Sequence, residues 1–361
     1  MGIFSSFRQQ VFPSYLGVDL GTTSIKIVEV KNGSRSPQLV NYGFLESNGH
    51  LVRANRVIQT SSFKIFEADA ADMLKDLVVH MKPGTDVALA SLPSFAAFTT
   101  VLDFPELKPS ELEQALVYQA KQYIPIPLSE VALDWLKVGE YQDEKGFKHQ
   151  QILLISVARE HIEKYQKIFK MAGLRLTSLE IEGLSMIRAL IATDRTPTVI
   201  IDIGGRSTSV VFTENGGLKF VAQTDFAGAS ITQSLATSLH VSPLRAEDLK
   251  RERGITGTGP NYELSTIMLP FLDVILSEVK KAFYSYQTQF PKSAKIERAI
   301  LSGGGANLSG IEKYAQRELN IPVVKASTLF RFEYPSSLEP LVVDLSPLFS
   351  VASGLVLKEF I

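Results

Sequence analysis

The sequence contains no cysteine in 361 residues. This absence excludes disulfide bonds, thiolate metal sites and a thiol nucleophile, and it is compatible with a reducing cytoplasm. The chain also has no run of about 18 apolar residues, the length that a membrane-spanning helix needs. We therefore expect no direct membrane insertion.

Charge of one sign is not in excess either. The chain has 37 basic and 38 acidic residues, for a formal net charge of −1. This balance gives no electrostatic reason to expect nucleic acid or an anionic membrane as a partner. With 45% hydrophobic residues, a chain of this length is expected to form two lobes, each with its own core.

Two common nucleotide-binding motifs are absent. No G-x-x-x-x-G-K-[ST] phosphate loop occurs anywhere. The glycine-rich stretch SGGGA at 302–306 is not a dinucleotide fingerprint, because the residue three positions after Gly305 is Leu308 instead of glycine.

An internal repeat is the most informative feature that is present. Residues 16–33 read LGVDLGTTSIKIVEVKNG and residues 199–216 read VIIDIGGRSTSVVFTENG. Each copy predicts an apolar strand, an Asp and Gly turn, and a second β-branched strand that ends in Asn-Gly, a favoured two-residue hairpin turn. Two copies in matching register indicate a duplicated lobe.

The turn in the first copy suits phosphate. Gly21 lets the backbone approach a ligand closely, and Thr22 and Thr23 add hydroxyl donors. Because a carboxylate beside phosphate repels it unless a divalent cation intervenes, Asp19 is interpreted as a direct or water-mediated Mg²⁺ partner. An Asp that caps a hairpin turn is the alternative.

The second copy supplies Asp202, Gly204 and Gly205 at the same positions. Two such turns, one from each lobe, can hold one phosphate tail and one metal ion from opposite sides. The third glycine-rich piece, Gly303, Gly304 and Gly305, lies between a predicted strand and helix. It can lie flat against a planar base or a sugar, or serve as a flexible helix entry.

The remaining segments alternate between strand and helix patterns, as in α/β proteins. Residues 93–173 have the order strand, helix, strand, strand, helix, which predicts an inserted subdomain. We expect helices over 109–124, 159–171, 183–193 and 228–253, a long helix or a pair broken at Pro270 over 264–290, and a closing helix over 347–358.

The order of the two hairpins and SGGGA resembles the phosphate 1, phosphate 2 and adenosine motifs of the actin, hexokinase and DnaK-type chaperone superfamily. The resemblance implies an α/β, actin/hexokinase-like (ribonuclease H-like) fold of two lobes, with ATP and Mg²⁺ between them. Glu278, Lys281 and Ser285 have the spacing of the chaperones' adenine-binding helix. They would contact ribose and adenine, unless they form a solvated charged face.

Within this superfamily the chain resembles the PilM family of type IV pilus assembly proteins over nearly its whole length. The resemblance rests on GVDLGTTSIKIVEV, QALVYQAKQYIPIPLSEVALDW and ILLISVAREHIEKYQKIFKMAGLRLTSLEIE. The insert 93–173 resembles the 1C (SHS2-like) subdomain that PilM shares with the division protein FtsA. The sequence stops at Ile361 without the amphipathic anchor usual in FtsA, which favours PilM.

The resemblance implies the following domain organisation. The first lobe spans 1–195, with a 1A core at 1–92 and 174–195 and the 1C subdomain at 93–173. The second lobe spans 196–361, with a 2A core at 196–228 and 296–361 and a 2B subdomain at 229–295.

For catalysis, analogy with the chaperones makes Glu182 the candidate that orients water. A Glu at a helix start also stabilises the helix through its dipole. Where the family often has two glycines near the γ-phosphate, this chain has Gly228 followed by Ala229. The resemblance therefore implies firm nucleotide binding and at most a slow ATPase.

The implied function is that of a cytoplasmic, nucleotide-dependent scaffold, held peripherally at the inner membrane through protein partners. The implied partner is the N-terminal cytoplasmic tail of PilN, in a groove between the first lobe and the 93–173 subdomain. Residues 95–104 are its candidate lining, or else strand core. Self-association, an FtsA-like filament function and a small-molecule kinase activity remain as alternatives.

Overall fold

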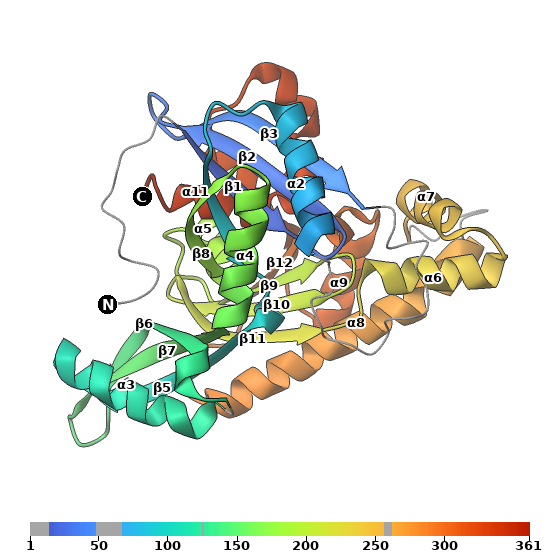
Figure 1. The fold of residues 1–361 in the computed structure, drawn as a ribbon. Helices are drawn as coiled ribbons and strands as arrows, with labels where there is room; N and C mark the ends of the chain where they lie inside the picture. Colours follow the sequence, from blue (N-terminus) through green and yellow to red (C-terminus); the bar gives the residue numbers. More distant parts are fainter. Residues whose placement is uncertain (1–13, 48–66, 125, 256–261) are drawn as a thin grey trace.

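The computed structural model describes residues 14–47, 67–124, 126–255 and 262–361. Two five-stranded sheets and one three-stranded sheet make up its strand framework. Figure 1 shows the helices packed around and between these sheets.

The first sheet has the strand order β3-β2-β1-β4-β8. Its strands are β1 (Ser14–Leu20), β2 (Ser24–Lys31), β3 (Gln38–Glu46), β4 (Val87–Leu92) and β8 (Arg175–Ile181). The first three strands are antiparallel neighbours, and β4 and β8 run parallel to β1. Every residue of β1 and β4 is buried, as expected for apolar central strands that are covered on both faces.

The second sheet repeats this arrangement as β11-β10-β9-β12-β13. Its strands are β9 (Thr198–Ile203), β10 (Thr208–Glu214), β11 (Gly217–Thr224), β12 (Arg298–Ser302) and β13 (Val323–Lys325). Again three antiparallel strands are followed by two parallel ones. The strand order and directions confirm the internal repeat.

The two halves of the repeat also share the register in which their first two strands pair. Asp19 lies one residue before the end of β1 and pairs with Lys26 of β2, and Asp202 lies one residue before the end of β9 and pairs with Ser209 of β10. The two aspartates therefore occupy equivalent positions at the same ends of their sheets.

The two Asn-Gly turns differ, and one prediction was wrong. Asn215 and Gly216 both have positive φ and join β10 to β11 directly, as a two-residue turn requires. After β2 the connection instead runs from 32 to 37 before β3 begins. The carboxylate of Glu333 accepts hydrogen bonds from the backbone N–H groups of Arg35 and Ser36, which holds this longer loop in place.

The smaller sheet, β5-β7-β6, lies within the predicted insert. It consists of β5 (Ala97–Pro105), β6 (Val131–Gln142) and β7 (Lys148–Ala158), all antiparallel. Helix α3 (Pro109–Tyr123) covers one face and shares a small core with the sheet. The helix begins at Pro109 as predicted, where proline fits the first turn, and the Glu111 carboxylate accepts a hydrogen bond from the Lys108 N–H.

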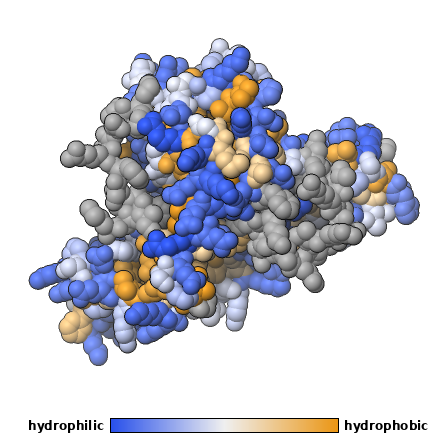
Figure 2. All heavy atoms as spheres, in the orientation of Figure 1, coloured by the Kyte–Doolittle hydropathy of each residue, from blue (hydrophilic) through white to orange (hydrophobic). Residues whose placement is uncertain are grey.

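Helix α4 (Arg159–Met171) closes the insert in sequence but packs with the first lobe. It lies beside α2 (Glu67–Met81), as Figure 1 shows, and its Tyr165, Ile168 and Phe169 belong to the core of the first sheet. Figure 2 shows the polar outer face along α4, with apolar side chains gathered below it over the smaller sheet. The subdomain boundaries drawn from the sequence stay predictions.

The second lobe carries α6 (Gly228–Leu239), α7 (Pro243–Arg253), α8 (Tyr262–Gln289) and α9 (Ile311–Leu319). The single helix expected over 228–253 is broken, because His240 adopts the left-handed conformation and Ser242 caps a new helix that starts at Pro243. Helix α8 instead continues through Pro270, held by a buried apolar stripe that includes Met268 and Leu272.

Two helices, α5 (Glu182–Leu190) and α11 (Ser350–Leu357), cross each other between the lobes, and α10 (Val342–Leu348) leads into α11. A Cβ on Gly354 would lie 1.8 Å from the Ser185 carbonyl oxygen, so only glycine allows this approach. Arg188 of α5 donates to the Gly354 carbonyl at 2.6 Å and to both carboxylate oxygens of Glu180. The two helices are therefore fixed to each other and to β8.

Short 3₁₀ turns complete the described chain. They span Ser94–Ala96, Leu128–Glu130, Gly304–Asn307, Thr328–Arg331 and Ser336–Leu341. Among the described residues no single helix is long and apolar enough to cross a membrane. Two consecutive segments, 336–348 and 350–357, are long and apolar enough only when taken together, and the chain bends by 91° between them.

The crossing of α5 and α11 yields a stability prediction. Gly354→Ala should lower the free energy of unfolding by about 2 kcal/mol, since the added methyl group forces two buried helices apart. Chemical denaturation measures this loss. Ser353→Ala, on the same helix, is the control and should change stability by less than about 1 kcal/mol, because its buried hydroxyl has no hydrogen-bond partner among the described residues. Equal stability of Gly354→Ala and wild type would contradict the close packing.

Candidate functional site between the lobes

A cavity of about 460 Å³ lies between the two repeated sheets. Its wall combines the ends of β1 and β9, the turns that follow them, the start of α6 and the glycine-rich segment after β12. Most residues predicted for the site meet here: Asp19, Gly21, Thr22, Thr23, Glu182, Asp202, Gly204, Gly205, Gly228, Gly303, Gly304 and Gly305 all line it.

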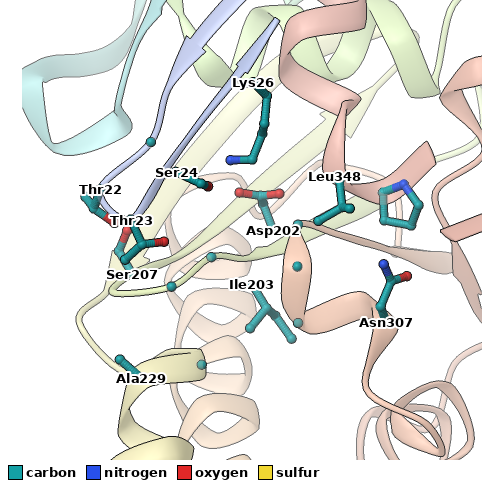
Figure 3. A pocket seen from close by; sticks show the side chains of 18 of the residues that line it. Thr22, Thr23, Ser24, Lys26, Asp202, Ile203, Ser207, Ala229, Asn307 and Leu348 are labelled. Atoms are coloured by element: carbon teal, nitrogen blue, oxygen red, sulfur yellow. The ribbon is translucent and has the colours of Figure 1, made fainter. Parts of the chain in front are cut away.

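Lys26 is a site residue that the sequence analysis missed. Its Nζ lies 3.0 Å from Asp19 Oδ2, and both side chains are largely buried. Burial lowers the pKa of Lys26, but the charges of Asp19, Asp202 and Glu182 outweigh burial and leave the pKa above its ordinary value. Figure 3 shows the amino group directed toward the Asp202 carboxylate. A charged lysine therefore sits among the acidic groups.

The acidic groups of the cavity repel one another. Burial raises the pKa of Glu182 well above its ordinary value, and the Asp19 and Asp202 carboxylates raise it further. Burial also raises the pKa of Asp202, although a hydrogen bond from Ser302 and the charge of Lys26 oppose this. One lysine thus faces three carboxyl groups, and the cavity has room for further positive charge.

The two hairpin turns touch each other across the cavity. A Cβ on Gly205 would lie 2.3 Å from Thr23 Oγ1, so a side chain at this position would separate the lobes. The carbonyl oxygens of Gly204 and Gly205 accept hydrogen bonds from the N–H groups of Gly228 and Ala229, at 3.1 and 2.8 Å. The start of α6 is therefore attached to the second hairpin turn.

The glycine-rich segment packs against the end of β9. Gly303 has φ +78°, and a Cβ there would lie 2.5 Å from the Ile203 carbonyl oxygen and 3.0 Å from Asp202 Oδ1. A Cβ on Gly305 would lie 2.4 Å from Ile203 Cγ2. Glycine is required at both positions for the segment to reach the cavity beside Asp202.

A second set of missed residues comes from α7. Glu247, Lys250 and Arg251 line the cavity. Lys250 Nζ lies 2.6 Å from Glu247 Oε2, and Arg251 bonds Glu247 at 2.8 Å and reaches Glu46 of the first lobe at 2.5 Å. Burial would raise the pKa of Glu247, but its cationic partners, chiefly Lys250, lower it to about 2. The sequence feature that could have pointed to these residues is the spacing of Glu247 and Lys250, three residues apart near the end of a helix.

The structure does not bring Glu278, Lys281 and Ser285 to the cavity. Helix α8 contributes Leu272 to the lining and none of these three residues. Glu278 pairs with Lys281 at 2.6 Å, and the Lys281 side chain is 72% exposed. The placement of these residues beside ribose and adenine is therefore corrected: they form the solvated charged face that was the alternative.

The donor set of the cavity fits a water-coordinated cation better than a directly liganded one. Among the described residues, no group of three His, Cys, Asp or Glu side chains is close enough to hold a metal ion. Asp19 and Asp202 nevertheless face one cavity with Glu182. Carboxylates around an open volume suit Mg²⁺, which retains several of its waters.

A second cavity, of about 750 Å³, lies where the smaller sheet meets the first lobe; we call it the side groove. It is lined by Asp134, Trp135, Leu136, Ile155, Glu180, Ile181, Leu184, Ile187, Arg188, Ala192, Thr193, Gly216, Arg331, Lys358 and Ile361. The residues 95–104 proposed as lining are absent from this set. Residues 97–104 belong to β5, on the opposite edge of the smaller sheet from β6, and Leu102 and Phe104 are buried in its core, while 95 and 96 lie in the preceding 3₁₀ turn.

Comparison with known proteins adds three likenesses. The family model "Type IV pilus assembly protein PilM" matches residues 17–360. A solved PilM–PilN type IV pilus biogenesis complex matches with a TM-score of 0.79 at 22% identity, over 96% of this chain and 98% of that one. MreB5 of Spiroplasma citri bound to ADP matches with a TM-score of 0.54 at 14% identity, over 94% of each chain. These likenesses confirm the expected actin-like fold.

The chain also matches the sequences of several cell division proteins named FtsA. That of Neisseria meningitidis serogroup B is 24% identical over 194 residues, 48% of this chain and 47% of the relative. That of Enterococcus hirae is 21% identical over 345 residues, 86% of this chain and 77% of the relative. The match with the Neisseria protein thus spans about half of that protein.

The raised pKa of Glu182 yields a pH-dependent stability prediction. In the unfolded chain this carboxyl group ionises near its ordinary pKa of about 4.3, whereas in the ligand-free fold its ionisation is disfavoured. Folded-state stability is therefore lost as the pH rises above the ordinary value. Glu182→Gln should be more stable than wild type at pH 8, and the difference should vanish toward pH 4.

Thermal denaturation over this pH range measures the effect. Glu144→Gln, on the exposed turn between β6 and β7, should leave stability unchanged at every pH. A Glu182→Gln variant that is less stable than wild type at pH 8 would show that the carboxylate is stabilised in the fold.

Proposed function

This chain belongs to the type IV pilus assembly protein PilM family, and we propose that it binds ATP with Mg²⁺ between its lobes and acts as a nucleotide-dependent scaffold in pilus biogenesis. The observation that carries the nucleotide part is the convergence of two equivalent strand ends, Asp19 and Asp202, on one cavity. The MreB5 neighbour was solved with ADP, which supports the same class of ligand.

The charges of the cavity suit a triphosphate that arrives with its metal. Lys26 offers an ammonium group for phosphate oxygens, while Asp19, Asp202 and Glu182 would repel bare phosphate. Mg²⁺, held through water by Asp19 and Asp202, would supply the positive charge between these carboxylates and the phosphates. The small residues of both hairpin turns leave room for the triphosphate to approach the backbone.

The nucleoside would lie on the side of the second lobe. Glu247 offers a carboxylate that accepts hydrogen bonds from ribose hydroxyls, and Lys250 is held beside it. Leu308, Leu348 and Gly304 add apolar surface to the lining of the cavity, which suits a planar base. Figure 3 shows Asn307 and Leu348 on the opposite side of the cavity from Thr22 and Thr23.

Turnover is expected to be slow. Glu182 is the candidate to orient water, but its raised pKa leaves it a poorly ionised group until a cation enters. Ala229 follows Gly228 at the start of α6, so a single glycine faces the phosphate end. Nucleotide would therefore control the scaffold through its binding more than through its hydrolysis.

For the partner, we propose the N-terminal cytoplasmic tail of a PilN-like inner-membrane protein, bound in the side groove. The PilM–PilN neighbour was solved as a complex. In this chain β6 and β8 are edge strands of their sheets within the described residues, and both border the groove. Edge strands offer free backbone groups to an extended peptide. Bound in this way, the protein would be cytoplasmic and peripheral to the inner membrane.

The nucleotide site is tested by removing the two aspartates. Asp19→Ala and Asp202→Ala should each weaken Mg·ATP binding by about tenfold or more, since each removes a charge that faces the metal. In EDTA the same variants should bind ATP at least as well as wild type, because a repelling carboxylate is gone. Isothermal titration calorimetry measures both affinities.

Asp69→Ala, on the exposed start of α2, is the control and should leave both affinities unchanged. Unchanged Mg·ATP binding in both cavity variants would show that the two hairpins do not form the phosphate site.

The groove is tested by a charge on its apolar wall. Leu136→Glu should weaken binding of the PilN tail peptide by about tenfold or more, because it places a carboxylate against apolar side chains. Leu136 is 40% exposed, so the variant should fold. Leu244→Glu, at 44% exposure on α7, is a matched control. Fluorescence anisotropy with labelled peptide gives the affinities; equal loss in both variants would place the peptide elsewhere.

A further inference from the structure

We propose that Asp134 selects the occupant of the side groove by pairing with a positively charged group, a Lys or Arg side chain or a free amino group, of an otherwise apolar extended peptide. This inference rests on the proposed function, because it concerns the groove assigned there to the partner's tail. It adds the chemistry by which the groove would recognise that tail.

The carboxylate of Asp134 has unused capacity. It lies on β6 and is half-buried, and Oδ1 accepts a hydrogen bond from the Trp135 N–H at 2.9 Å. No other hydrogen bond or ion pair of this carboxylate occurs among the described residues. Burial raises the pKa of Asp134 against the opposing effects of the Trp135 N–H and Lys358. A poorly solvated carboxylate of this kind gains much from a cation placed against it.

Three other charged groups of the groove, Glu180, Arg188 and Lys358, already have partners. Arg188 binds both carboxylate oxygens of Glu180, at 2.6 and 2.9 Å, and the Gly354 carbonyl oxygen. Lys358 donates to Ser178 at 3.0 Å and lies 4.0 Å from Glu180. Asp134 is therefore the acidic group of the groove that is left for a ligand.

The surroundings of Asp134 are apolar, which restricts the ligand. Leu136 lies two residues along β6 and so shares the face of the strand with Asp134. Ile181, Leu184 and Ile187 also line the groove, from β8 and α5; Ile181 and Ile187 are already buried, whereas Leu184 and Leu136 are partly exposed. A small hydrated ion would leave Leu136 and Leu184 uncovered, whereas a peptide with apolar residues on either side of one cation covers them and neutralises the carboxylate.

Strand geometry limits how such a peptide lies. The bordering edges of β6 and β8 favour an extended chain, in which alternate side chains point to the same side. A cation that faces Asp134 would then have apolar neighbours two positions away on the same wall. The recognised pattern is thus apolar, any residue, cation, any residue, apolar.

The experiment is a double-mutant cycle on the full chain with a synthetic peptide of the partner's cytoplasmic tail. Wild type, Asp134→Asn and Asp134→Lys are titrated with the native peptide, with peptides in which each Lys or Arg is changed to Met or Glu, and with an N-acetylated peptide. Asp143→Asn, on the β6–β7 turn outside the groove, is the control.

Asp134→Asn should weaken binding of the native peptide by about tenfold or more. For this variant, replacing the one Lys or Arg of the peptide that faces position 134, or acetylating its amino group, should cause no further loss of affinity. Asp134→Lys should prefer the peptide that carries Glu at that position. Unchanged affinity in Asp134→Asn, or independent effects of protein and peptide changes, would overturn the inference while leaving the groove in place. No binding of the native peptide to wild type would overturn the proposed function as well.

Discussion

The close crossing of α11 over α5 is the constraint on which both sites depend. Glycine at 354 lets one helix rest on the backbone of the other at Ser185, and Gly17 of β1 is packed as closely against the Ala352 carbonyl. Both helices lead from one cavity to the other: α5 carries Glu182 into the cavity between the lobes and Arg188 into the side groove, while Val351 of α11 lines the first cavity and Lys358, directly after α11, lines the second. Because Arg188 joins both helices to β8, a ligand that shifts one helix shifts the walls of the other cavity.

The electrostatics of the cavity between the lobes explain why a metal-bound ligand suits it. Three carboxyl groups surround Lys26, and burial raises the pKa of Glu182 and of Asp202, so the ligand-free cavity favours protonation of Glu182. A divalent cation would reverse this balance and restore the charge of the carboxylates. In the proposed function the same groups would act against bare phosphate and in favour of phosphate with its metal, and nucleotide entry would change the charge at the start of α5.

The repeat carried most of what the sequence could predict. Its aspartates and glycines mark equivalent strand ends, so the paired sheets and seven of the twelve predicted lining residues followed from the repeat. Gly303, Gly304 and Gly305 came from the glycine-rich stretch, and Glu182 and Gly228 came from the family resemblance. Lys26 was missed because its role depends on antiparallel pairing with Asp19, a relation between strands that spacing alone does not reveal. Glu247 and Lys250 were not singled out in the sequence, whereas Glu278 and Lys281 were; the direction in which α7 and α8 face separates the two pairs. The side groove joins six separate segments of the chain and has no local signature.

The two halves of the repeat have diverged in ways that assign each a different task. At equivalent positions β2 carries Lys26 and β10 carries Ser209, so the cation at this position comes from the first half. Between β4 and β8 the first half also contains the smaller sheet, whose β6 borders the side groove. The second half carries its additional helices between β11 and β12, where α7 brings Glu247 and Lys250 to the cavity and Lys250 donates to the Gly228 carbonyl oxygen. Each addition thus extends one site, and the crossing helices keep the two sites in mechanical contact.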